Sequence, residues 1–532
     1  MSKARIKLFL FLIVGFAFFV RIWQVASIPP SLSWDEVSIG YNAYSILKTG
    51  RDEYGRVLPL DTFVAYGDYK PPLSVYATVP FVAVFGLNEL AVRLPSVIAG
   101  TLTVLATYFL VLELFSVSLF TFHLSLITAL LLAISPWHIQ LSRAGFEANI
   151  ALFFVVMGTY LLLRARKNSK LFAIAFLPFI AAGYTFNSAR YFSPLLIFGL
   201  LAFCRKEALQ QKRIVILGFI VAILALLPIM PHLVSKEARL RFAEVNIFTD
   251  ASIVATANRR MEQEGNSFIS KVFDNRRIGF VRLYLAHFLD HMQPWFLFVK
   301  GDGNPKFSIQ DVGQLYPIEA PLLVLGIFWL FGRERSIAWL LLWWIIAAIV
   351  PAAVARETPH ALRIENSLPV WQVFIAYALL HVRKKILMVL VIGAYVFSFS
   401  YFWHNYFNHY PAEYSGEWQY GYREAIRFIQ PIKGNYQSIV LTESIGRPYM
   451  YVLFYELYDP NAARRDIKGN FDAAGFYNVT GLGKYRFVRE GAGDLQKQTL
   501  YILPPAQVPG SAHILQTIPL LNGQPQLVIF DV

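Results

Sequence analysis

The chain has 532 residues, of which 56% are hydrophobic and only 15% are charged. A soluble protein of this length cannot bury so much apolar surface in ordinary domains, so the composition excludes a soluble class. The formal net charge is +14, but the basic residues fall in short clusters between apolar runs, as in cytoplasmic loops, which argues against nucleic acid as a partner. One cysteine, Cys204, excludes an intrachain disulfide and argues against a thiolate metal site.

Long apolar runs predict a polytopic α-helical membrane protein, because about 20 mostly apolar residues cross a bilayer. The first run lacks a cleavage site and is expected to be a retained helix. With about eleven spans, every basic cluster lies on the side of the N-terminus, which predicts a cytoplasmic N-terminus. Residues 74–86 and 278–299 could each form a short or surface-lying helix. The predicted spans lie at about 7–26, 91–114, 119–135, 148–163, 171–187, 191–204, 214–231, 317–332, 336–354, 367–381 and 386–403.

The loop at about 27–90, between the first two spans, is too polar for lipid and is predicted to lie outside. It contains Ser33-Trp34-Asp35-Glu36, which has the S-x-x-E form of a capping box and predicts a helix through Leu47. Asp35 and Glu36 could therefore be helix-cap residues only. The same geometry would keep Asp35 ionised beside the membrane, where it could accept a proton from an acceptor group.

Other charged residues recur on the predicted outer side. Asp68 and Lys70 precede Pro71-Pro72, so they mark either a simple turn or, for Lys70, a phosphate-binding cation. Arg93 stands at the outer mouth of the second span, where an arginine can also snorkel to the headgroups. A further pair, Arg143 and Glu147, precedes the fourth span.

A carboxylate at the edge of an apolar span is costly unless it is paired, so Glu147 is a candidate functional residue. His360 and Arg363 lie on the outer side before the tenth span, although a lone loop histidine is more often incidental. An acidic pair and several basic groups at one interface suit a neutral nucleophile and an anionic leaving group, as in sugar transfer from a lipid phosphate. We recognise no dedicated metal cage, but acidic groups could hold a divalent cation through oxygen ligands.

The composition changes after the last span. Residues 404–532 mix β-rich runs at 438–443, 485–488, 499–503 and 526–530 with helix-like stretches at 422–430 and 447–458. This pattern predicts a C-terminal extracytoplasmic α/β domain. The chain is therefore expected to divide into a membrane domain at 1–403 and a second domain at 404–532.

Four runs in the first 165 or so residues carry a family resemblance: WDEVSIG, DYKPPL, VRLPSVIAG and SRAGFEANIALFF. In this order they resemble the protein O-mannosyltransferase superfamily and its bacterial relative that transfers aminoarabinose to lipid A. Both groups are GT-C glycosyltransferases that use polyprenyl-phosphate sugars. The resemblance implies a GT-C fold and assigns roles by position. Asp35 matches the catalytic acidic residue that activates the acceptor, and Glu36 is its motif partner. Asp68 and Lys70 match the second loop motif, Arg93 a basic residue on the donor side and Glu147 the acidic residue entering the fourth span.

The chain also departs from these relatives. Ser38 stands where the aminoarabinose enzymes have an arginine, and Asp68 lies two positions before Lys70 instead of next to it. The segment at 232–316 is unlike the β-trefoil insert of the protein mannosyltransferases. These differences leave the acceptor and the details of phosphate binding open.

The expected function is an inverting transfer of a hexose or pentose from a polyprenyl-phosphate carrier to a protein, lipid or glycan acceptor, outside the plasma membrane and among its lipids. Asp35 would be the base. Lys70 and Arg93, with Arg363 as an additional candidate, would stabilise the phosphate leaving group electrostatically. Asp68 and Glu147 would orient substrate or a basic partner.

Two alternatives remain. The first is an oligosaccharyl transferase or glycan ligase of the same fold class, although residues 404–532 lack a W-W-D-type motif. The second is a lipid-glycan transporter, which would place ionisable residues near mid-membrane in matching halves. Here the charges gather at the predicted outer interface and no halves match.

Overall fold

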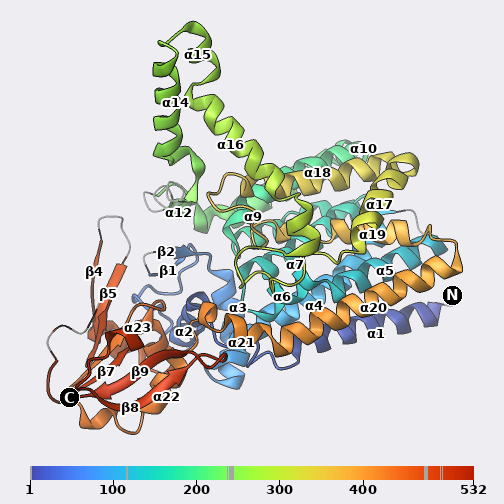
Figure 1. Cartoon of the computed structure of the whole chain (residues 1–532). Helices are drawn as coiled ribbons and strands as arrows, with labels where there is room; N and C mark the ends of the chain where they lie inside the picture. Colours follow the sequence, from blue (N-terminus) through green and yellow to red (C-terminus); the bar gives the residue numbers. More distant parts are fainter. Residues whose placement is uncertain are drawn as a thin grey trace. The chain divides into compact units, whose positions relative to one another are not determined.

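The computed structural model describes residues 3–66, 68–115, 118–235, 238, 245–472, 477–489, 491, 493 and 495–532. The chain forms two compact units, each built from several stretches of sequence. The first, the helical unit, comprises Met1–Phe18, Ala99–Leu141 and Ala148–Phe402. The second, the α/β unit, comprises Phe19–Ile98, Ser142–Glu147 and Trp403–Val532. Figure 1 labels the elements of both.

A helix occupies each of the eleven predicted spans. In chain order the helices at or between these spans are α1 (Lys3–Ile22), α4 (Glu89–Leu114), α5 (Leu119–Ile134), α6 (Pro136–Arg143), α7 (Glu147–Arg164), α8 (Leu177–Gly183), α9 (Asn187–Phe203), α10 (Arg205–Gln210), α11 (Lys212–Leu226), α12 (Met230–Leu233), α17 (Glu319–Arg333), α18 (Arg335–Ala352), α19 (Val370–Leu379) and α20 (Lys385–Asn408). The 3₁₀ segment Ser169–Ala173 precedes α8 within the fifth predicted span.

Among the described residues, five helices are long and apolar enough to cross a membrane by length and composition: α4, α7, α11 continued to Leu233, α18 and α20. The pair α5 and α6, bent by 56° at Ser135, would make a sixth. Shorter apolar helices occupy Leu73–Phe85, Ser169–Gly183 and Val370–Leu379. The chain is therefore a membrane protein with several apolar helices, and the number of spans stays a prediction.

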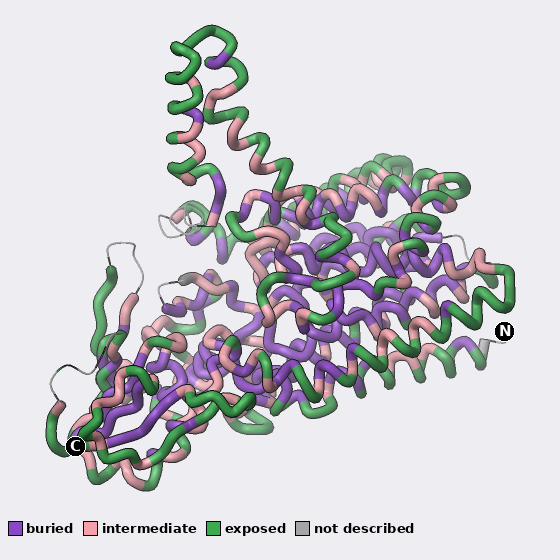
Figure 2. Tube along the Cα trace, viewed as in Figure 1, coloured by how far each residue is buried: buried purple, intermediate pink, exposed green. Residues whose placement is uncertain are grey.

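The helical unit has a tightly packed interior. Buried residues make up α19 from Val370 to Ala378, and α19 packs against α17 and α5. Gly326 of α17 permits this approach, because a Cβ there would lie 1.9 Å from the carbonyl oxygen of Phe374. By contrast few residues of α20 are buried (Figure 2), and many of its large apolar residues are exposed. Such surfaces are compatible with lipid and unfavourable in water.

Where the structure describes it, the segment between α12 and α17, predicted as a long polar connection, contains three longer α-helices. They are α14 (Ala251–Gln263), α15 (Phe268–Phe273) and α16 (Arg276–Asp290). Each begins at a residue whose side chain accepts a backbone N–H bond: Asp250, Ser267 and Asn275. Such N-caps satisfy donors that a helix leaves unpaired at its start. Of the predicted short helix at 278–299, α16 covers the part up to Asp290, and a separate π-helical turn lies at Trp295–Val299.

The α/β unit contains a mixed sheet that is seven strands wide among the described residues, in the order β4-β5-β6-β3-β7-β9-β8. Its centre, β3, runs parallel to β6 and β7, and the outer pairs are antiparallel. The four predicted β-rich runs are strands β3, β6, β7 and β9. The bounds are β3 (Ser438–Thr442), β4 (Ile467–Phe471), β5 (Tyr477–Leu482), β6 (Tyr485–Val488), β7 (Thr499–Leu503), β8 (His513–Pro519) and β9 (Pro525–Asp531).

The same unit also contains the loop between the first two predicted spans, folded as a helix, a hairpin and a second helix. The loop contains α2 (Trp34–Thr49), β1 (Phe63–Ala65), β2 (Asp68–Lys70) and α3 (Leu73–Phe85). The C-terminal part of the unit contains the helices α21 (Tyr410–Tyr414), α22 (Tyr422–Ile429), α23 (Pro448–Tyr455) and α24 (Pro460–Asp466). Apolar residues of α22 and α23 share one core with the sheet, and α2 joins that core through Val37 and Tyr41. The loop and the C-terminal residues, distant in sequence, are therefore packed together.

Candidate active site

Helix α2 begins with the predicted capping box. The Ser33 hydroxyl accepts a bond from the backbone N–H of Glu36 at 3.4 Å, and the Glu36 carboxylate accepts one from the backbone N–H of Ser33 at 2.9 Å. This reciprocal pair fixes where the helix starts. Asp35 and Glu36 consequently lie in the first helical turn, where the helix dipole favours negative charge.

Glu36 faces inward and joins three segments of the α/β unit. Its side chain is 1% exposed. Oε1 accepts a bond from Nε of Arg93 at 2.9 Å and from the backbone N–H of Gly145 at 2.9 Å. A Cβ at Gly145 would lie only 3.2 Å from Cγ of Glu36, so the small residue suits this approach. Glu36 is thus a buried junction that is shielded from solvent.

Two buried arginines hold the chain that leads into α2. Arg93 donates to the carbonyl oxygens of Val25, Pro29 and Ser31 at 2.6–2.8 Å. Arg143 donates to four further carbonyls at 2.7–3.2 Å, which belong to Val20, Arg21, Trp23 and Ile28. Both side chains are fully buried. The snorkelling interpretation of Arg93 is therefore wrong, because its guanidinium binds carbonyl groups inside the protein.

Aromatic rings cover the two guanidinium groups. Arg93 lies 5.9 Å from the ring centre of Trp418, and Arg143 lies 5.0 Å from Tyr406 and 4.9 Å from Phe407. Such cation–π contacts are strongest when they are shielded from water. These partners could not be predicted from the sequence, since aromatic residues at the end of the last apolar run are typical of any membrane interface.

Asp35 has the opposite environment to its neighbour Glu36. Its side chain is 36% exposed, and its Oδ1 lies 2.9 Å from Nζ of Lys70 in an ion pair. Lys70 ends the hairpin β1–β2, in which it pairs with Phe63. The hairpin also contacts the start of α2 directly, because the Tyr66 hydroxyl donates to the carbonyl oxygen of Trp34 at 2.6 Å. This arrangement brings an accessible carboxylate and an ammonium together.

The remaining predicted residues have different positions. The side chain of Asp68 lies outside the described residues, and its backbone pairs with Ala65. Glu147 is half-buried in the first turn of α7 and belongs to the α/β unit. His360 and Arg363 belong to the helical unit.

In the helical unit, the ring of His360 packs at a tilt against that of Phe307 with ring centres 4.9 Å apart, and its Nδ1 lies 4.0 Å from the carboxylate of Asp302. Burial lowers the pKa of His360 well below its usual value and raises the pKa of Asp302 to about 6. Arg363 donates to the carbonyl oxygen of Glu357 at 3.4 Å.

A buried carboxyl group at Glu53 was not anticipated from the sequence. It accepts bonds from the hydroxyl of Tyr449 at 3.0 Å and the amide of Asn42 at 3.4 Å, and burial raises its pKa to about 8. The group therefore links α2, through Asn42, to α23. Asp52 and Glu53 stand in a polar run that looks solvated, so the sequence carried no signal for this contact. Among the described residues, no group of three or more His, Cys, Asp or Glu side chains is arranged to hold a metal ion.

This fold and site can be compared with known proteins. Residues 69–234 match the family model described as dolichyl-phosphate-mannose-protein mannosyltransferase; they include Lys70, Arg93, Arg143 and Glu147 and begin after Asp35. The structure of ArnT from Cupriavidus metallidurans in the apo state superposes with a TM-score of 0.55 over 99% of this chain and 98% of that one, at 12% identity. The chain has a GT-C fold.

Further GT-C structures agree. ArnT from the same organism bound to undecaprenyl phosphate matches with a TM-score of 0.55 and 12% identity over 100% of this chain and 98% of that one. The Archaeoglobus fulgidus oligosaccharyltransferase tethered with an acceptor peptide matches with a TM-score of 0.51 and 13% identity over 86% and 63% of the two chains. At these identities the likeness concerns the fold. No curated protein sequence matches the chain.

Proposed function

We propose that the protein is a membrane glycosyltransferase that moves one sugar from a polyprenyl monophosphate to an acceptor on the outer side of the membrane, with inversion. The observation that carries the proposal is the accessible Asp35–Lys70 pair at the start of a firmly held helix. The family match over residues 69–234 and the GT-C fold support the reaction class. The N-terminus is then cytoplasmic and the α/β unit extracytoplasmic.

Asp35 acts as the general base. An acceptor hydroxyl attacks the anomeric carbon of the donor, the bond from that carbon to the phosphate oxygen breaks, and the acceptor proton passes to the Asp35 carboxylate. A base must lie within hydrogen-bonding reach of the proton that it takes. Asp35 meets this condition because it is exposed, whereas the neighbouring Glu36 is enclosed by Arg93 and Gly145.

Lys70 stabilises the departing carrier phosphate. Its ammonium is a compact positive charge, suited to a phosphate whose negative charge grows as the bond breaks. In this structure the ammonium also compensates the charge of Asp35. Asp68, Glu147, His360 and Arg363 remain candidate substrate-binding residues.

Arg93 and Arg143 receive a positioning role in this proposal, in place of direct phosphate binding. Their guanidinium groups are buried and donate to seven backbone carbonyls between Val20 and Ser31. By fixing that segment and Glu36, they hold the helix start on which Asp35 stands. A displacement of that helix would move the base out of reach of the acceptor.

The neighbouring structures bear on the choice of substrate. ArnT has been solved with undecaprenyl phosphate, and the archaeal oligosaccharyltransferase AglB with an inhibitory peptide and a dolichol-phosphate. A polyprenyl-phosphate-linked donor is therefore the first choice here. A protein, lipid or glycan acceptor is compatible with the exposed carboxylate, and divalent cations should be included in the assays.

The test is sugar transfer by the purified full-length protein, using labelled polyprenyl-monophosphate and -diphosphate sugars with membrane extract or a simple alcohol as acceptor. Asp35→Asn is compared with Asp61→Asn, because Asp61 is a 30% exposed carboxylate that pairs with Arg56 in the same loop. We expect Asp35→Asn to lose turnover while donor binding survives, and Asp61→Asn to behave like wild type. Equal activity of both variants would refute Asp35 as the base, and transfer only from diphosphates would favour the oligosaccharyltransferase alternative.

A further inference from the structure

The three helices α14, α15 and α16 form an arm of the helical unit that the proposed sugar transfer does not use. The C-terminal half of α16 is attached to the end of α18. The Tyr284 hydroxyl donates to the carbonyl oxygen of Val350 at 3.2 Å, and Nδ1 of His287 lies 2.9 Å from the carbonyl oxygen of Ala355. The base of the arm therefore lies at the end of α18 (Figure 1). This helix is apolar and long enough to cross a membrane.

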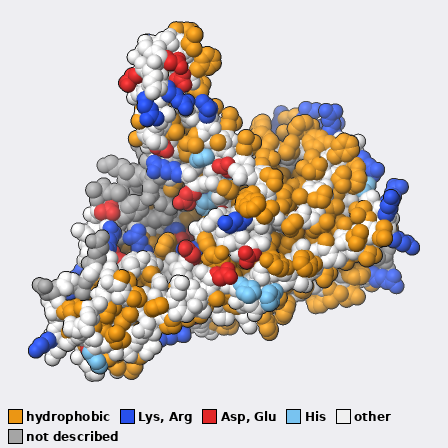
Figure 3. All heavy atoms as spheres, in the orientation of Figure 1, with side chains coloured by type: hydrophobic (Ala, Val, Ile, Leu, Met, Phe, Trp, Pro, Cys, Tyr) orange, Lys and Arg blue, Asp and Glu red, His pale blue; other side chains and the backbone are white. Residues whose placement is uncertain are grey.

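One face of α16 is an exposed apolar stripe. Ile278, Val281, Leu285 and Leu289 are 37%, 53%, 53% and 62% exposed. Their spacing of three, four and four residues places them on one side of a helix. Figure 3 shows hydrophobic side chains along an edge of the arm.

The short helix α15 extends this apolar surface at the far end of the arm. Its exposed side chains are Phe268, Ile269, Val272 and Phe273, at 82%, 65%, 41% and 65%. A contiguous apolar surface of this extent on a protein normally marks contact with another protein or with a membrane.

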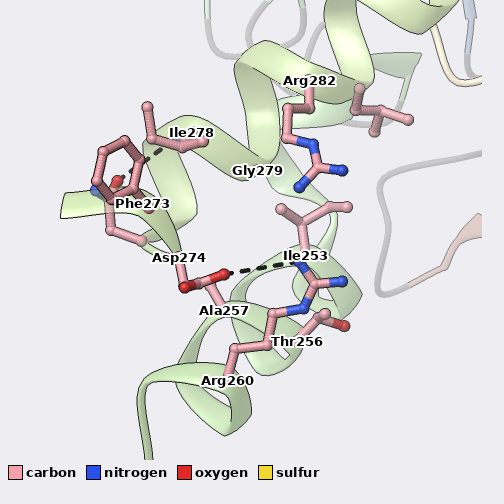
Figure 4. A pocket seen from close by; sticks show the side chains of 11 residues that line it. Ile253, Thr256, Ala257, Arg260, Phe273, Asp274, Ile278, Gly279 and Arg282 are labelled. Atoms are coloured by element: carbon pink, nitrogen blue, oxygen red, sulfur yellow. Dashed lines mark hydrogen bonds and ion pairs between the residues drawn. The ribbon is translucent and has the colours of Figure 1, made fainter. Parts of the chain in front are cut away.

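The other helix of the arm leaves Val281, Leu285 and Leu289 exposed, whereas Ile278 lines the hollow beside it. α14 packs against a different side of α16, where Gly279 allows Ile253 to approach: a Cβ at Gly279 would lie 2.9 Å from Ile253 Cγ2. A hollow of about 350 Å³ separates parts of the two helices, with Arg260 and Arg282 on its wall and an ion pair of 3.7 Å between Arg260 and Asp274 (Figure 4).

Basic residues accompany the stripe. At about 3.6 residues per turn, Arg277 falls on one side of the stripe and Arg282 on the other. Both are exposed, as are Lys271 and Arg276 near the turn between α15 and α16. An amphipathic helix with an apolar face and flanking Lys or Arg is the pattern of a helix that lies in the membrane–water boundary and binds anionic lipids.

We propose that the arm is a membrane-surface element, with the stripe of α16 and the side chains of α15 in the lipid boundary and Arg277 and Arg282 on the phosphates of anionic phospholipids. Three observations favour lipid over a protein partner: the attachment to the end of α18, the continuous stripe and the arginines on both of its sides. The proposal does not depend on sugar transfer. A protein without transferase activity would still show it.

Spin labels can locate the stripe. Val281→Cys and Leu285→Cys are compared with Asn258→Cys, an exposed position on α14, in the full-length protein in nanodiscs of phosphatidylcholine with or without phosphatidylglycerol. Wild type provides the labelling blank, because its only cysteine, Cys204, is buried. With phosphatidylglycerol, we expect labels at 281 and 285 to meet oxygen severalfold more often than a water-soluble nickel chelate, and the label at 258 to show the reverse.

Two outcomes would overturn membrane contact. Labels at 281 and 285 that meet the nickel chelate as often as the label at 258 would place the stripe in water. Labels shielded from both reagents would mean that a second copy or another protein covers it. Combining Arg277→Gln with Arg282→Gln should reduce the lipid contact of the label at 281 in phosphatidylglycerol discs. The same contact with this double variant, or in phosphatidylcholine alone, would overturn the role assigned to anionic lipid.

Discussion

Replacing Arg93 by methionine tests whether the buried ion pair holds the start of α2. Methionine resembles the aliphatic part of arginine but has no hydrogen-bond donor. The substitution therefore leaves the Glu36 carboxylate without its counter-charge and three carbonyl groups, of Val25, Pro29 and Ser31, without these bonds. Both members of the pair are almost completely buried, so water cannot replace the lost donors without an opening of the structure.

The expected cost follows from this burial. Removing one partner of a buried ion pair costs about 3–5 kcal/mol. At roughly 1.4 kcal/mol for each factor of ten, local opening of the segment at 20–36 should become about 100- to 4,000-fold more frequent. The control Arg56→Met breaks an ion pair with Asp61 in which both side chains are about one-third exposed. Exposed pairs contribute about 0–1 kcal/mol, which predicts less than a roughly sixfold change.

Hydrogen exchange read by mass spectrometry measures this opening in nanodiscs. Peptides covering 25–37 should exchange much faster in Arg93→Met, whereas peptides from β3 should match wild type and report that the sheet remains folded. Adding Glu36→Gln to Arg93→Met removes the stranded charge and should recover at least about tenfold of the lost protection. Exchange of 25–37 in Arg93→Met that stays within a few-fold of Arg56→Met would refute the reasoning.

Three further predictions concern the same unit. A Cβ at Gly40 would lie 2.6 Å from Phe454, so Gly40→Ala should cost about 1–3 kcal/mol and lower the thermal unfolding midpoint. The control Gly434→Ala adds a Cβ in open space and should leave the midpoint unchanged. Equal shifts of the midpoint in both variants would contradict this prediction. Burial raises the pKa of Glu53 from 4.5 to about 8, so its contribution to stability is full below 4.5 and lost as the pH rises through 8. Glu53→Gln should flatten unfolding midpoints between pH 5 and 8, and an unchanged slope would count against the buried carboxyl. If the proposed transfer is correct, Lys70→Gln should lower kcat/KM about 10- to 100-fold, with partial rescue in Lys70→Arg, and unaltered kinetics would exclude a role for Lys70 in the reaction.

Local patterns determined much of the fold. Apolar runs of sufficient length predicted eleven spans, and a helix lies in each of them. The prediction works because the apolar content of one contiguous segment decides whether it can form a buried or lipid-facing helix. The S-x-x-E pattern predicted the cap of α2, since both partners lie within four residues. The runs rich in β-branched and aromatic residues likewise marked β3, β6, β7 and β9.

Only the tertiary structure decided what the charged residues of the site do. Asp35 and Glu36 are adjacent acids in the same helical turn, yet one is exposed beside Lys70 and the other is enclosed by Arg93 and Gly145, which lie 57 and 109 positions further along the chain. The S-x-x-E pattern assigns Glu36 to the cap, but no local pattern shows which of the two carboxylates meets Arg93 and which meets Lys70. Their difference arises because folding brings distant groups to one side of the helix and leaves the other side open. The carboxylate on the buried side is therefore paired within the protein, and the carboxylate on the open side can contact a substrate.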